Sequence, residues 1–166
     1  MPATKDNPAE DRIILERFFR FPRARTRYVR ATGKPIHRPT ALGKLISWLL
    51  ECTKPIKEHS TEFHSIKEFS EELGWGNNGN VIRNISHIYP TKRTTGGEVF
   101  TQLSYWIEEI FGYKDDEGII RGPIIEPDKL IEMSIVDDPK GMIWMEVASM
   151  IQNHVKGSMR SRGLKV

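Results

Sequence analysis

Four polar residues near the middle of the chain have the types and spacing of a surface that contacts DNA bases. Asn80, Arg83, Asn84 and His87 stand at positions i, i+3, i+4 and i+7, which share one face of an α-helix. In the major groove an arginine pairs with guanine O6 and N7, and an asparagine pairs with adenine N6 and N7. Residues 79–89 contain no carboxylate that would repel phosphate. The pattern predicts a base-contacting helix over these residues, here named the candidate recognition helix.

The opposite side of the candidate recognition helix is apolar and is predicted to face the core. It carries Val81, Ile82, Ile85, Ile88 and Tyr89. Residues 76–80, GNNGN, precede the helix and offer backbone amides to a phosphate. Lys92 and Arg93 follow it and can hold the flanking DNA backbone. Asn78, Lys92 and Arg93 are therefore predicted phosphate contacts.

A basic, proline-broken segment, PRARTRYVRATGKPIHRPT, occupies residues 22–40 and is here named the basic arm. Residues 12–38 contain nine Lys or Arg and one acid, a net charge of +8. The arm has too little apolar content to fold alone, so it is expected to order against a polyanion or a partner. Tyr28 suits either an anchor to the core or a stack on a base. The predicted phosphate contacts of the arm are Arg23, Arg25, Arg27, Arg30, Lys34 and Arg38.

Apolar periodicity and capping signals predict further helices around these segments. Their ranges are residues 8–20, 40–53, 65–73, 96–112, 127–136 and 139–156. Ser65 and Glu68 form a predicted capping box at the start of one of them. Two short edge strands are expected at residues 119–120 and 124–125, and a frayed basic tail after residue 156. The predicted fold class is mainly α, with at most a small β-hairpin.

Residues 65–89 resemble a helix-turn-helix, with the helix at 40–53 as the supporting first helix. Ile66, Phe69, Leu73 and Trp75 occupy the usual apolar slots, and Gly74 lies in the turn. The GNNGN stretch makes this turn longer than the compact pattern, as winged-helix proteins tolerate. Residues 91–100, TKRTTGGEVF, fit either a wing hairpin or, as favoured here, a basic loop that enters a helix. The resemblance covers residues 40–95 and implies a trihelical core that binds DNA.

The charge pattern divides the chain into three regions. Residues 1–39 hold the first helix and the basic arm, residues 40–112 the helix-turn-helix-like core, and residues 113–166 a helical C-terminal region. Residues 98–138 contain eleven acids and three bases, a net charge of −8. Because such a surface is repelled by DNA, residues 98–156 are predicted to serve a homodimer or another protein partner.

Catalytic and metal-binding chemistry has weaker support in the sequence. His59, Glu62 and His64 are too isolated for a metal site, and residues 114–118, KDDEG, lack the ligand spacing of a calcium loop. A magnesium-dependent nuclease would need clustered carboxylates, for which no defensible spacing exists. The candidate carboxylates are Asp115, Asp116, Glu126, Asp128, Glu132, Asp137 and Asp138. We expect no enzyme activity, no metal and no cofactor.

These patterns together predict a non-enzymatic nucleic-acid-binding protein, with DNA favoured over RNA. It would act as a regulator or as a replication accessory of a phage, plasmid or other mobile element. The alternative is a non-enzymatic subunit or phage-type effector of a larger nucleoprotein assembly that acts through RNA or protein contacts. The sequence has no run of eighteen apolar residues, no signal-peptide pattern and a single cysteine, Cys52. The expected location is therefore the cytoplasm, and the nucleoid if the protein binds DNA.

Overall fold

The computed structural model describes residues 12–20, 38–55, 65–76, 81–82, 85, 87–88, 97–112 and 123–161. Its elements are α2 (Leu15–Phe18), β1 (Arg38–Pro39), α3 (Ala41–Cys52), α4 (Ile66–Leu73), β2 (His87–Ile88), α6 (Gly97–Phe111), α7 (Pro127–Met133) and α8 (Met142–Ser161). The described part is mainly helical, which confirms the predicted fold class. β1 and β2 form a short antiparallel pair between distant segments rather than a hairpin.

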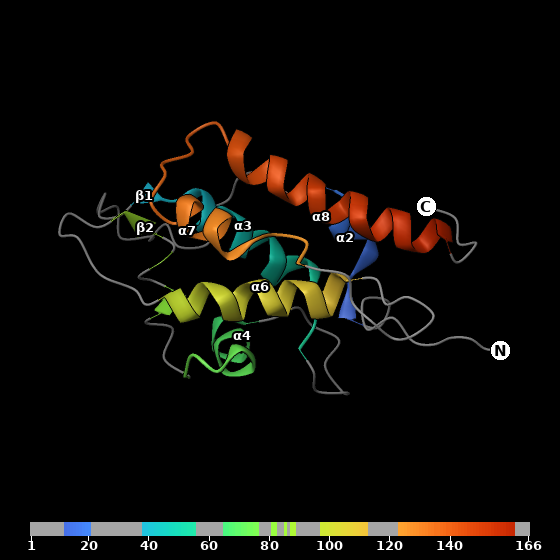
Figure 1. Cartoon of the computed structure of the whole chain (residues 1–166), viewed down its shortest axis with the longest axis horizontal. Helices are drawn as coiled ribbons and strands as arrows, with labels where there is room; N and C mark the ends of the chain where they lie inside the picture. The colour runs from blue at the N-terminus through green and yellow to red at the C-terminus, as the bar shows by residue number, and fades with distance from the viewer. Residues whose placement is uncertain are drawn as a thin grey trace.

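Helix α3 is the central element of the core. All ten residues from Ala41 to Leu50 are buried, including Lys44 and Ser47, because α2, α7 and α8 pack around the helix. In Figure 1, α3 lies behind α6 and α7 and beneath α8. Trp48 of α3 stacks on Phe18 with ring centroids 5.4 Å apart. The apolar stripe predicted at residues 40–53 is confirmed, but burial extends around the whole helix.

Helix α4 packs against α6 and has well-defined ends. The predicted capping box is present: Glu68 N donates to the Ser65 hydroxyl (3.1 Å), and Ser65 N donates to the Glu68 carboxylate (3.3 Å). Phe69 meets Trp106 of α6 edge to face, with ring centroids 5.0 Å apart. The helix ends at Gly74, whose φ of +80° is a left-handed conformation that favours glycine.

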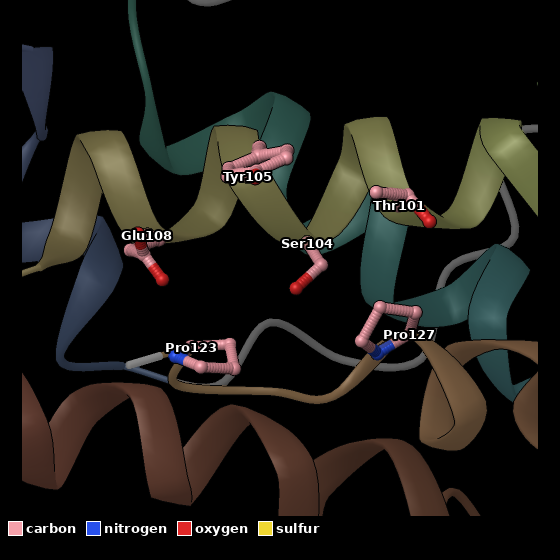
Figure 2. A pocket seen from close by; sticks show the side chains of 6 residues that line it. All are labelled: Thr101, Ser104, Tyr105, Glu108, Pro123 and Pro127. Carbon is pink, nitrogen blue, oxygen red and sulfur yellow. The ribbon is translucent and has the colours of Figure 1, made fainter. Parts of the chain in front are cut away.

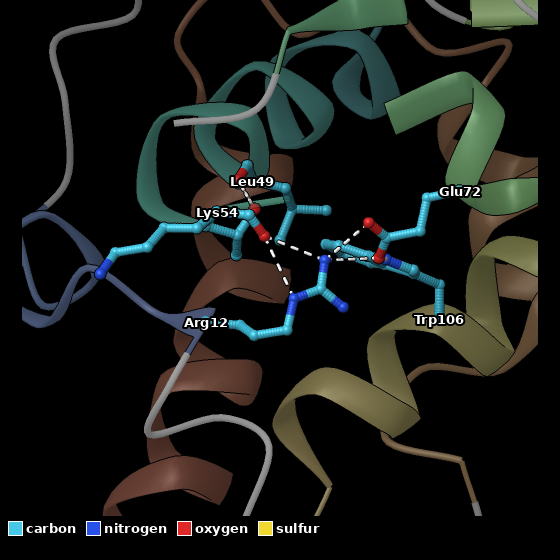
Figure 3. Close-up of polar contacts among 6 residues, drawn as sticks. Arg12, Leu49, Lys54, Glu72 and Trp106 are labelled. Atoms are coloured by element: carbon cyan, nitrogen blue, oxygen red, sulfur yellow. Dashed lines mark hydrogen bonds and ion pairs between the residues drawn. The ribbon is translucent and has the colours of Figure 1, made fainter. Parts of the chain in front are cut away.

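A polar network joins the N-terminal segment to three helices, as Figure 3 shows. The Arg12 guanidinium donates to the Lys54 carbonyl oxygen at 2.9 and 3.1 Å. It also donates to the Glu72 carboxylate of α4, at 2.5 and 2.7 Å. Trp106 Nε1 of α6 donates to Glu72 Oε2 at 2.6 Å. Since Lys54 follows α3, these contacts hold the N-terminal segment, α3, α4 and α6 in one arrangement.

The single helix predicted over residues 8–20 is wrong at Ile13 and Ile14. Ile13 forms an antiparallel bridge with Thr53, and Ile14 N donates to the Cys52 carbonyl oxygen at 2.7 Å. Backbone groups that a helix would use internally are instead paired with the end of α3. Phe18 on the following turn is fully buried.

The C-terminal helices also differ from their predicted ranges. Helix α7 ends at Met133, and α8 begins at Met142 instead of residue 139. The buried Asp138 carboxylate accepts hydrogen bonds from Ile143 N (3.2 Å) and Trp144 N (2.9 Å), which fixes the start of α8. Helix α8 continues to Ser161, so the frayed tail predicted after residue 156 is wrong for residues 157–161.

No strand forms at residues 124–125, which are bends in the structure. Pro123 and Pro127 flank this segment, and proline cannot donate to a strand ladder. The Ile125 carbonyl oxygen instead accepts a hydrogen bond from Ser104 Oγ of α6 at 2.7 Å. The other predicted edge strand, at residues 119–120, lies outside the described residues.

Candidate nucleic-acid interface

The turn after α4 directs the chain toward the candidate recognition helix. Gly74 and Gly76 have φ values of +80° and +90°, which glycine adopts without steric cost. Between them Trp75 is buried, and its indole Nε1 donates to Gln102 Oε1 of α6 at 2.9 Å. Trp75 N also donates to the Ser70 carbonyl oxygen at 2.8 Å. The exit from α4 is therefore fixed by two left-handed glycines and a buried tryptophan.

The described part of the candidate recognition helix has the predicted apolar back. Val81, Ile82 and Ile85 are helical. Ile82 and Ile85 are 0% and 1% exposed, and Val81 packs partly buried against the core. This burial confirms the predicted orientation of the aliphatic side. Three predicted base contacts lie outside the described residues: Asn80, Arg83 and Asn84.

The C-terminal end of the candidate recognition helix differs from the prediction. His87 and Ile88 form strand β2 and are not helical, so the predicted range to residue 89 is wrong there. β2 pairs with β1, placing His87 opposite Pro39 and Ile88 opposite Arg38. Pro90 also disfavours a helical conformation at the residue before it. His87 consequently does not share a continuous helical face with the other three polar residues.

Thr40 connects the end of the basic arm to the end of the candidate recognition helix. Its fully buried hydroxyl accepts a hydrogen bond from Gly43 N (3.0 Å), which caps α3. The same hydroxyl donates to the Ile85 carbonyl oxygen at 3.1 Å. Thr40 directly follows β1, so two backbone segments that are distant in sequence are held side by side. This arrangement of Thr40, Ile85, β1 and β2 is named the Thr40 junction.

The segment before α8 packs beside the Thr40 junction. Ala41 N donates to the Val136 carbonyl oxygen at 2.9 Å, and Thr40 forms an antiparallel bridge with Asp137. Lys44 Nζ, within α3, donates to the Asp138 carbonyl oxygen. The start of α3 is thus fixed from two directions, by the Thr40 junction and by residues 136–138.

The predicted phosphate contacts fall mostly outside the described residues. Arg38 is in β1, where its backbone pairs with Ile88. Those outside are Arg23, Arg25, Arg27, Arg30, Lys34, Asn78, Lys92 and Arg93. Tyr28 and the metal alternative at His59, Glu62 and His64 are outside as well. The wing alternative for residues 91–100 is wrong at residues 97–100, which begin helix α6 as the favoured alternative predicted; residues 91–96 lie outside the described part. The structure therefore places the base of the arm and leaves these side chains as predictions.

The carboxylates of the nuclease alternative are not gathered where the structure describes them. Asp138 is buried as the cap of α8, whereas Asp137 is exposed. Within the described ranges, no three His, Cys, Asp or Glu side chains lie close enough to hold a metal ion. Asp115 and Asp116 lie outside these ranges.

A pocket on α6 was missed by sequence reasoning. It has a volume of about 310 Å³, and Figure 2 shows it between α6 and the segment that precedes α7. The lining side chains are Thr101, Ser104, Tyr105, Glu108, Pro123 and Pro127. Burial, and secondarily the charge of Glu109, raises the pKa of Glu108. The four α6 residues stand at i, i+3, i+4 and i+7, the same spacing as the polar residues of the candidate recognition helix. This shared helical face is the one sequence signal that could have indicated this part of the pocket.

Comparisons with models of known families, with curated proteins and with solved structures give no match to this chain. The described helices include none that combines the length and the apolar character needed to cross a membrane.

Proposed function

We propose that this protein is a non-enzymatic DNA-binding protein with a helix-turn-helix-like segment. Helix α4 supports the candidate recognition helix, whose Arg83 and Asn84 contact base edges in the major groove. The basic arm contacts phosphates on the same duplex. The observation that carries the proposal is the Thr40 junction, which fixes the base of the arm beside the end of the candidate recognition helix.

The Thr40 junction supports this function because it restricts how the two basic segments are placed. An arm attached elsewhere would have to be ordered independently when DNA binds, at a cost in conformational entropy. The pairing of β1 with β2 brings the last residues of the arm to a defined position beside His87 and Ile88. Binding of one segment to a duplex then raises the local concentration of the other segment near that duplex.

Base contact is tested with a library of mixed-sequence duplexes in moderate salt. Wild-type protein is expected to select a preferred site. Arg83→Lys keeps the positive charge but loses the fork that pairs with two guanine acceptors, so site preference should fall while non-specific binding persists. Arg83→Ala and Asn84→Ala should each cost about 1–3 kcal/mol of discrimination at one position. Unchanged site preference in all three variants would refute the assignment of the recognition helix.

The role of the basic arm is tested by the salt dependence of binding. On duplex DNA, the slope of log K against log salt decreases in magnitude by about 0.9 for each phosphate that the protein no longer neutralises. Replacing Arg23, Arg25, Arg27 and Arg30 by alanine should therefore reduce it by up to about 3.6. Site preference should survive this change, because phosphate contacts carry no direct sequence information. An unchanged slope would show that the arm does not bind DNA.

The second candidate function is a subunit or effector that acts through RNA or protein contacts. It is supported by exposed apolar side chains just after α7 and at the start of α8, together with the acidic charge of residues 98–138. Ile135 and Met142 are 74% and 69% exposed. Purified protein that binds neither DNA nor RNA after a high-salt wash, judged by the 260/280 nm ratio and by titration, would favour this candidate over the first.

A further inference from the structure

We infer that the pocket on α6 binds an alkylammonium or guanidinium group, with Glu108 as the ion-pairing residue. This site lies away from the candidate recognition helix in sequence and does not rest on the DNA-binding proposal. The inference stands on the shape of the pocket, on the chemistry of its lining and on the charge of the surrounding region.

The walls of the pocket are fixed by contacts within the protein. Ser104 Oγ donates to the Ile125 carbonyl oxygen at 2.7 Å, which holds the segment from Pro123 to Pro127 against α6. Figure 2 shows Ser104 and Glu108 pointing from α6 toward that segment. The space between them is therefore a formed cavity, and at about 310 Å³ it is at the lower end for ligand sites.

The described lining selects for positive charge on a short apolar stem. It includes one carboxylate, that of Glu108, and no Lys, Arg or His. Tyr105 is 64% exposed, so its ring is accessible for a cation–π contact. The rings of Pro123 and Pro127 offer apolar surface to methylene groups. The hydroxyl oxygens of Thr101 and Ser104 keep lone pairs that can accept further N–H bonds.

The surroundings of the pocket also favour a cation. Within the described residues of 98–138 there are eight acids and one base, a net charge of −7 that attracts positive ligands and repels anions. Glu109 follows Glu108 on the same helix and does not line the pocket. Partial burial and the Glu109 charge both disfavour ionised Glu108, and a bound cation would relieve this by supplying a counter-charge.

Two sources can supply such a group: a free alkylamine or alkylguanidine, or a lysine or arginine side chain of a protein. Butylguanidine and butylamine represent the free source, and the peptide Gly-Arg-Gly with blocked ends represents the protein source. Butanol is the uncharged control of similar size. Each is titrated into the full chain, and binding is followed by the backbone amide NMR shifts of Thr101, Ser104 and Tyr105.

Glu108→Gln and Glu109→Gln form a matched pair, because both remove one negative charge from adjacent positions of α6. Loss of a charge-assisted hydrogen bond should weaken cation binding about tenfold in Glu108→Gln. Glu109→Gln should stay within about twofold, as expected for screening of a nearby surface charge. Thermal unfolding of both variants checks that the fold is kept.

Shifts confined to the pocket, with the selective loss in Glu108→Gln, would support the site. Tighter binding of butylguanidine or butylamine then indicates a free ligand, and tighter binding of the peptide indicates a protein side chain. Either result supports the inference. It is overturned if both variants weaken binding equally, if butanol binds as well as the cations, or if no probe binds at 50 mM. DNA binding is measured separately on Glu108→Gln and is expected to be unchanged, so failure of one proposal is distinguishable from failure of the other.

Discussion

Replacing Thr40 by valine tests the Thr40 junction with little change in side-chain volume. The substitution keeps the branched shape and removes one buried hydroxyl. That hydroxyl accepts from Gly43 N and donates to the Ile85 carbonyl oxygen. Thr40→Val therefore removes the cap of α3 and one connection to the candidate recognition helix in a single step.

The expected loss of stability follows from these two hydrogen bonds. Removing a threonine N-cap costs about 0.5–2 kcal/mol. Leaving a buried carbonyl oxygen such as that of Ile85 without its donor costs about 1–3 kcal/mol. Because Thr40 is fully buried, water does not readily replace the hydroxyl. We expect a decrease of roughly 2–3 kcal/mol in the free energy of unfolding, and a Tm lower by about 4–12 °C for a chain of this size.

The assay combines urea unfolding with amide hydrogen exchange. Urea gives the free energy of unfolding, and an unchanged m value would show that the same surface is exposed on unfolding. Hydrogen exchange should show reduced protection at Gly43, which donates to the Thr40 hydroxyl, and in β2, which begins two residues after Ile85. The Arg12 network lies at the opposite end of α3 and should keep its protection.

Thr53→Val is the matched control at the other end of α3. Thr53 is also fully buried, and its hydroxyl donates to the Leu49 carbonyl oxygen of the same helix at 2.7 Å. Thr53→Val should lower stability without a specific loss of protection in β2. A decrease below about 0.5 kcal/mol for Thr40→Val, the size of an ordinary surface substitution, would refute the bridging role of this hydroxyl.

Three further predictions concern buried and partly buried polar groups. Glu72→Gln should lower the free energy of unfolding by about 2 kcal/mol in urea, because it removes the carboxylate charge that pairs with the largely buried Arg12 guanidinium. The exposed Glu71→Gln should change it by less than about 0.5 kcal/mol. Burial, aided by the charge of Glu51, raises the pKa of the Cys52 thiol well above its usual value. Native protein should therefore react with a thiol reagent at pH 8 at least about a hundredfold more slowly than unfolded protein. Equal rates would contradict the burial of Cys52. Partial burial lowers the pKa of His154 from 6.5, so at this residue the folded state binds fewer protons than the unfolded state. The contribution of His154 to stability should be constant above pH 6.5 and decrease as the pH falls below it. His154→Gln should therefore reduce the difference in unfolding free energy between pH 7.5 and pH 5, measured in urea; an unchanged difference would contradict the burial of the imidazole.

Elements set by local signals were predicted well from the sequence. The capping box of Ser65 and Glu68 lies within one helical turn, and so does the apolar spacing of α3 and α6. Pro127 at the first turn of α7 is a local signal of the same kind. Such signals involve residues three or four apart, so they are visible without knowledge of the tertiary fold.

Features that depend on distant residues could not be predicted in this way. The pairing of β1 with β2 joins segments far apart in the chain, and strands of two residues have no measurable periodicity. The interruption of the first helix at Ile13 depends on the backbone of Thr53. The Arg12–Glu72 ion pair likewise joins two surface-type residues whose burial only the packed helices create. The pocket on α6 requires a wall, Pro123 to Pro127, that comes from a separate segment of the chain.

The i, i+3, i+4, i+7 spacing occurs twice in this protein, and the two cases show what it can establish. On α6 it gathers Thr101, Ser104, Tyr105 and Glu108 around a pocket whose described lining holds one carboxylate. In the candidate recognition helix the buried Ile82 and Ile85 confirm that the apolar side faces the core. The spacing of the polar residues does not by itself indicate which ligand they bind. What distinguishes the second case is its attachment to the basic arm through Thr40.

This distinction gives the DNA-binding proposal its most informative comparison, between Thr40→Val and Arg83→Lys. Arg83→Lys should reduce site preference at unchanged stability, because in the proposed function Arg83 contacts only a base. Thr40→Val should reduce stability, and should also weaken binding at temperatures well below its Tm, because one of the contacts that hold the arm beside the helix is lost. If Thr40→Val binds DNA as tightly as the wild type while fully folded, the two segments act independently. The Thr40 junction would then be a stabilising contact only, and the proposed function would rest on the acid-free helix alone.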